Sequence, residues 1–101
     1  MTDTMSDDLH PESGTRLLFE LRDDAPAYAD YAVTAHMAGT VSHAGSGRVT
    51  LGTETVELEL PEAPDWVVTL AQRFLRQIAA GQRGEETPRW PRRLLRWRAE
   101  P

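Results

Sequence analysis

Residues 64–80 read PDWVVTLAQRFLRQIAA, and this stretch decides the fold. Its apolar residues recur every three or four positions, which is the spacing of one face of an α-helix. Pro64 suits the first turn of a helix, Asp65 complements the helix dipole, and Gly81 is typical of the position after the last turn. The sequence therefore predicts one long amphipathic helix over residues 64–80. Its apolar stripe consists of Val67, Leu70, Ala71, Phe74, Leu75 and Ile78.

Before this helix, apolar and polar residues alternate, which is the pattern of half-buried β-strands. The predicted strands cover about residues 15–22, 28–42 and 47–60. Asp23, Asp24 and Pro26 supply turn chemistry after the first strand. The stretch HAGSG at residues 43–47 predicts a second turn, because glycine reaches the positive φ of tight hairpins. Gly52 interrupts the third segment, which is either one bulged strand or two short strands.

After the helix, the sequence RWPRRLLRWR occupies residues 89–98. It predicts a short helix over residues 91–98, with Trp90, Leu94 and Trp97 along one side. Such a short helix is marginal in water and needs tertiary contacts or a partner. The predicted fold class is therefore α+β: an antiparallel three- or four-stranded β-meander packed by one long amphipathic helix, plus a short C-terminal helix.

The length of 101 residues fits one domain. Residues 1–13 are acidic and lack apolar periodicity, so we expect a disordered acidic tail followed by a single α+β domain over residues 14–101. The first residues carry neither a basic stretch nor an apolar core, so they do not form a secretory signal. No apolar run approaches the length of a membrane span. These features predict a cytoplasmic protein without a membrane span.

Composition excludes several kinds of chemistry. The chain contains no cysteine, which removes disulfides, cysteine-based metal sites and a thiol nucleophile. All eleven basic residues are arginine. The lack of lysine excludes Schiff-base chemistry and a P-loop lysine, and it is typical of the codon bias of a GC-rich bacterial genome.

No arrangement of polar residues predicts catalysis. His10, His36 and His43 lack the spacing of metal ligands. Ser46 is flanked by Ala44 and Arg48 rather than by the glycines of a nucleophile elbow. The paired carboxylates at residues 7–8, 23–24 and 85–86 are neighbours in predicted loops or in the tail, where they are normally solvated. We therefore predict no catalytic, cofactor-binding or metal-binding residues, and a protein that is not an enzyme.

Charge is unevenly distributed along the chain. Residues 1–65 contain thirteen acidic residues and three arginines, a net charge of −10, whereas residues 66–101 contain three acidic residues and eight arginines, a net charge of +5. The C-terminal segment has three alternative interpretations: a structural cap on the core, a site for a protein partner or for self-association, or a contact with nucleic acid or a membrane surface. The candidate partner-binding residues are Arg89, Trp90, Arg92, Arg93, Arg96 and Trp97.

The functional hypothesis is a small bacterial accessory protein that acts by protein–protein contact rather than catalysis. The partner is either an unknown protein or a second copy, as in a homodimer. The alternative is a nucleic-acid-binding module that uses the C-terminal segment rich in arginine and tryptophan. The acidic body disfavours this alternative, because its field repels a polyanion.

Overall fold

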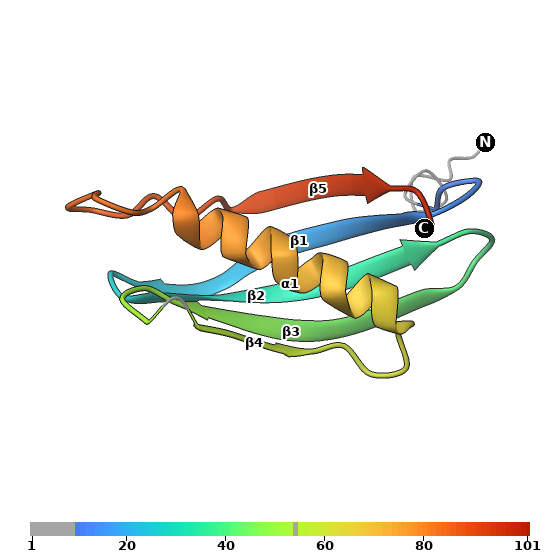
Figure 1. Cartoon of the computed structure of the whole chain (residues 1–101), viewed down its shortest axis with the longest axis horizontal. Coiled ribbons are helices and arrows are strands. Elements are labelled where there is room, and N and C mark those ends of the chain that lie inside the picture. Colours follow the sequence, from blue (N-terminus) through green and yellow to red (C-terminus); the bar gives the residue numbers. More distant parts are fainter. Residues whose placement is uncertain (1–9, 54) are drawn as a thin grey trace.

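The computed structural model describes residues 10–53 and 55–101 of the chain. Within these residues the chain forms a five-stranded antiparallel sheet and one helix, arranged as two layers (Figure 1). The strands are β1 (Thr15–Ala25), β2 (Tyr28–Met37), β3 (Ser42–Thr50), β4 (Thr55–Glu59) and β5 (Arg93–Arg98), and the helix is α1 (Asp65–Ala80). Their order across the sheet is β4-β3-β2-β1-β5.

The core lies between α1 and one face of the sheet. Alternate residues of β1 and β2, such as Leu17, Phe19 and Val33, are fully buried, as is Leu75 of α1. Their neighbours along the strands point to the opposite face, because successive side chains of a strand alternate. No helix or strand in the described part of the chain covers that opposite face, which we call the open face.

The predicted fold class is wrong in its finer statement, and only the broad α+β assignment holds. Residues 91–98 do not form a helix, because Arg93–Arg98 is the strand β5. The meander is extended by this fifth strand, which pairs with β1 rather than following β4 in the sheet. The physical reason is that β1 offers a free edge, and a strand there gains a ladder of hydrogen bonds that a short helix in water lacks.

The turn predicted at residues 43–47 is also absent, since these residues lie inside β3. The chain reverses instead between β2 and β3, where Gly39 has a φ of 78° and the Met37 amide donates to the Val41 carbonyl over 2.9 Å. Gly47 serves close packing, because a Cβ atom there would lie 2.8 Å from Cδ1 of Leu75 on α1. A Cβ atom at Gly45 would collide with the carbonyl of Glu59.

The predicted disordered tail covers residues 1–13, of which residues 1–9 lie outside the described part of the chain. Residues 10–13 lie against the sheet. The ring Nδ1 of His10 is 2.9 Å from the Met37 carbonyl, and Pro11 is buried. The Ser13 carbonyl accepts a hydrogen bond from Trp97 of β5.

Candidate partner-binding surface

Among the described residues, strand β5 lies at the edge of the sheet and pairs only with β1 (Figure 1). The Leu21 amide donates to the Arg92 carbonyl over 2.8 Å, which makes these opposite residues a hydrogen-bonded pair. In an antiparallel ladder, hydrogen-bonded pairs alternate with pairs whose backbone groups point away from each other. The N–H and C=O groups of Arg93, Leu95 and Trp97 therefore point away from β1, toward the free edge.

The side chains of β5 divide between the two sides of the sheet. Leu94, Arg96 and Arg98 lie on the side of α1, because they are opposite Phe19, Leu17 and Thr15 of β1. The side chains between them, those of Arg93, Leu95 and Trp97, lie on the open face. Each side of the edge therefore carries a different mixture of charged and apolar groups.

Two arginines of β5 bind the outward-pointing carbonyls of the same strand. Nη1 of Arg96 donates to the Leu95 carbonyl over 2.9 Å, and Nη1 of Arg98 donates to the Trp97 carbonyl over 2.7 Å. Arg98 also holds its guanidinium 4.9 Å from the centre of the Phe74 ring. These contacts lay both side chains along the free edge, where they occupy backbone acceptors that a neighbouring strand would otherwise use.

Trp90 belongs to the core. Only 7% of its surface is exposed, and its Nε1 donates to the Ala25 carbonyl over 3.1 Å. The fully buried Tyr31 donates its hydroxyl to the Pro91 carbonyl over 2.8 Å, which ties the chain beside Trp90 to β2. Burial, followed by the nearby charge of Asp24, raises the pKa of Tyr31 to about 12, so the hydroxyl keeps its proton near neutral pH.

The structure brings together only part of the predicted partner-binding set. Arg92, Arg93, Arg96 and Trp97 follow one another on or beside β5, and all four are exposed. Trp97 is 44% exposed, with its Nε1 donating to the Ser13 carbonyl over 2.8 Å. Arg89 is exposed in the preceding loop, where its amide donates to Oε1 of Gln82.

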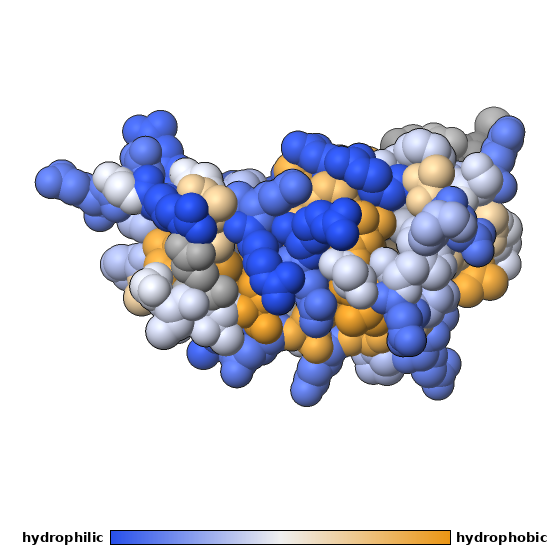
Figure 2. Space-filling view, viewed as in Figure 1, coloured by the Kyte–Doolittle hydropathy of each residue, from blue (hydrophilic) through white to orange (hydrophobic). Residues whose placement is uncertain are grey.

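A groove between α1 and β5 adds residues that the sequence did not group with this set. Its volume is about 560 Å³, and Trp66, Leu70 and Arg73 of α1 face Arg98 across it. Figure 2 shows strongly hydrophilic side chains over α1 and near β5, with apolar surface between them. Arg73 and Arg98 come together only because α1 packs beside β5, so the sequence pattern does not predict that they line one groove.

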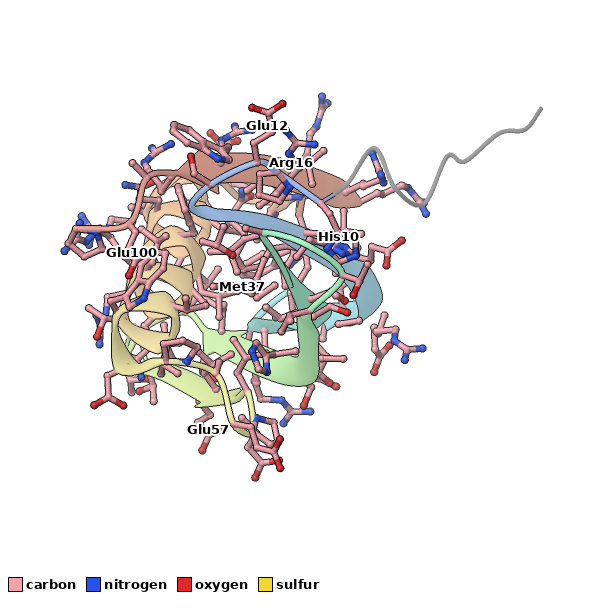
Figure 3. All side chains as sticks on the ribbon, turned by 90° about the vertical axis from the view of Figure 1, so that its right-hand side faces the viewer. His10, Glu12, Arg16, Met37, Glu57 and Glu100 are labelled. Atoms are coloured by element: carbon pink, nitrogen blue, oxygen red, sulfur yellow. The ribbon has the colours of Figure 1, made fainter. Side chains whose placement is uncertain are left out.

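The opposite edge of the sheet is acidic. Glu57 and Glu59 of β4 lie on the open face, and Figure 3 shows Glu57 far from β5. Nearby, Nε and Nη2 of Arg48 donate to the two carboxylate oxygens of Asp30 over 2.7 and 2.9 Å. This hydrogen bonding lowers the pKa of Asp30. A depression of about 530 Å³ here is lined by Arg22 and by these charged residues of both signs, which compensate one another.

His36 is an unusual polar group on the open face. Both of its ring nitrogens are buried and have no hydrogen-bond partner. Its ring meets that of His10 edge-to-face, with 5.1 Å between the ring centres. Burial, then the charges of His10 and Arg16, lowers the pKa of His36, while Glu20 acts weakly in the opposite direction.

Stability should therefore fall on mild acidification. Because the pKa of His36 is lower in the folded protein than its ordinary value of 6.5, the unfolded chain binds a proton more readily. The contribution of His36 is complete above about 6.5 and is lost as the pH falls from there toward the folded pKa, with a slope of at most about 1.4 kcal/mol per pH unit for one proton. Urea unfolding measured from neutral pH downward tests this. His36→Gln should flatten the profile, and an unchanged slope in that variant would contradict the assignment.

Neither the described residues nor the comparisons with known proteins add a further site. Within residues 10–53 and 55–101, no group of three or more histidine or carboxylate side chains is placed to hold a metal ion. The one helix of this part is too short and too polar to cross a membrane. No protein-family model, no curated protein and no solved structure matches this chain.

Proposed function

We propose that this protein acts by protein–protein contact and binds an acidic partner through the arginines of its β5 edge. The observation that supports this is a group of four exposed arginines on or directly before the edge strand β5, Arg92, Arg93, Arg96 and Arg98, in a chain whose net charge is −5. A local basic surface on an acidic molecule orients an incoming acidic partner, because opposite charges attract at that surface while the acidic parts of the molecule repel the partner. We call these four residues the β5 arginines.

Nucleic acid is the less favoured partner for this surface. Binding of single strands relies on aromatic side chains on which bases stack. Trp90 is buried, and Trp97 is anchored through its Nε1 to the Ser13 carbonyl.

Binding of poly-L-glutamate, compared with binding of a single-stranded oligonucleotide, tests the proposal. We expect the protein to bind poly-L-glutamate, and Arg96→Gln/Arg98→Gln to weaken this binding by about tenfold, since each lost charge pair contributes up to about 1 kcal/mol. Fluorescence anisotropy of labelled probes, at low and at physiological salt, measures both affinities. Salt should weaken the interaction, because these charges are exposed.

The matched control is Arg76→Gln/Arg83→Gln, which removes the same charge at exposed positions that line a depression without any residue of β5. It should bind poly-L-glutamate nearly as well as the unchanged protein. Equal losses in both double variants would mean that only overall charge matters and would contradict a site at β5. Tighter binding of the oligonucleotide than of poly-L-glutamate would favour the nucleic-acid alternative.

A further inference from the structure

We infer that the partner binds β5 by strand addition, and that its binding segment is an extended stretch in which acidic and apolar residues alternate. This inference rests on the proposed function and specifies the chemistry of the partner. The free edge of β5 presents the outward N–H and C=O groups of Arg93, Leu95 and Trp97. An extended peptide that joins such an edge gains main-chain hydrogen bonds, while the flanking side chains select its sequence.

The side chains on the two faces of β5 would contact different side chains of the added strand. On the side of α1, the new strand runs beside Arg96 and Arg98, which favour carboxylates. On the open face it runs beside Leu95 and Trp97, which favour apolar residues, and Arg93 lies on this face only at the start of β5. Successive residues of a strand alternate between faces, so the matching segment carries an acidic residue at every second position.

The arginine contacts with backbone carbonyls make the edge selective for acid. In the free protein, Arg96 and Arg98 occupy the carbonyls of Leu95 and Trp97 at 2.9 and 2.7 Å. A carboxylate of the incoming strand takes the guanidinium in a bidentate pair, which is stronger than the bond to a neutral carbonyl. The released carbonyl then accepts an N–H of the same strand. A neutral or basic strand must displace the arginine without this compensation, so it is disfavoured.

A second copy of the chain is a weaker candidate for this edge. Pairing two β5 strands would place one row of β5 arginines against another. Strand β4 has the alternating sequence TVELE, but a contact between β4 and β5 joins two different edges of the molecule. Such a head-to-tail contact does not close in a pair, and it would give a ring of several copies or a filament. We therefore assign the edge to a different protein.

Peptides of equal charge separate strand addition from simple attraction. The probe is an octapeptide that alternates glutamate and valine, compared with the same peptide N-methylated at every second residue and with a block peptide of the same composition. We expect the alternating peptide to bind, and the other two to bind at least about tenfold more weakly, because they lose hydrogen bonds or side-chain alternation. In NMR hydrogen exchange, the Leu95 and Trp97 amides should become protected only with the alternating peptide.

Each result bears on a different claim. If all three peptides bind alike without protection of Leu95, strand addition is overturned, while the β5 arginines remain a site for acidic partners. If neither these peptides nor poly-L-glutamate binds, the proposed function falls as well. Sedimentation of the protein alone should show a monomer. Self-association that Glu57→Gln/Glu59→Gln abolishes would overturn the assignment to a different protein.

Discussion

Phe74→Ala is expected to lower the free energy of unfolding by about 3–5 kcal/mol, the range found when a core aromatic is deleted. Phe74 is only 3% exposed and lies at the centre of the contact between α1 and the sheet. Its ring meets that of Phe19 edge-to-face, with 6.1 Å between ring centres and 68° between planes. The guanidinium of Arg98 also lies over the Phe74 ring, 4.9 Å from its centre.

Equilibrium unfolding in urea measures this loss, and Arg76→Ala provides the control on the exposed side of the same helix. The control should change stability by no more than about 0.5 kcal/mol, as surface substitutions usually do. A loss below about 1 kcal/mol for Phe74→Ala would mean that the helix does not pack through this residue. Phe74→Leu keeps the apolar volume without the ring, so it reports how much the aromatic and cation–π contacts add.

The elements defined by local periodicity were within reach of the sequence. The apolar stripe predicted a helix at residues 64–80, and the helix occupies Asp65–Ala80 with Val67, Phe74 and Ile78 buried. Alternation likewise placed strands around residues 15–22 and in the segment that begins at Tyr28. In each case the buried positions follow from the spacing of apolar residues within the element itself, so a single sequence suffices to detect them.

The glycines of β3 show where this reasoning stops. Glycine favours turns, but it also occurs where another chain segment approaches the backbone too closely for a side chain. At Gly47 the neighbour is Leu75, and at Gly45 it is the Glu59 carbonyl. Both neighbours are distant in sequence. The two uses of glycine therefore look identical until the packing of α1 and β4 is known.

The C-terminal segment could not be assigned for a related reason. Its residues are compatible with a short helix or with a strand, and the choice depends on the free edge that β1 provides more than seventy residues earlier in the chain. The pairing of β5 with β1 also decides which tryptophan of the segment is buried and which is exposed. It buries Trp90 beside the Ala25 carbonyl and leaves Trp97 on the open face.

Trp90→Ala should therefore cost about 3–5 kcal/mol, whereas Trp97→Ala should cost less than half as much. Trp90 is 7% exposed and its deletion also leaves the Ala25 carbonyl without its indole donor. Trp97 keeps 44% of its surface in water and contributes one exposed hydrogen bond to Ser13. Thermal and urea unfolding of the two variants side by side measure the difference, with far-UV circular dichroism to verify that each variant folds.

The same two variants separate stability from binding. Trp97 flanks the β5 edge, so Trp97→Ala should weaken binding of the alternating glutamate–valine peptide more than it lowers stability, because it removes apolar surface beside the added strand. Trp90 lies outside this edge, and Trp90→Phe, which keeps most of the buried volume, should leave peptide binding unchanged. Equal stability losses for Trp90→Ala and Trp97→Ala would show that both indoles belong to the core. The β5 edge would then present no apolar surface for a partner to contact.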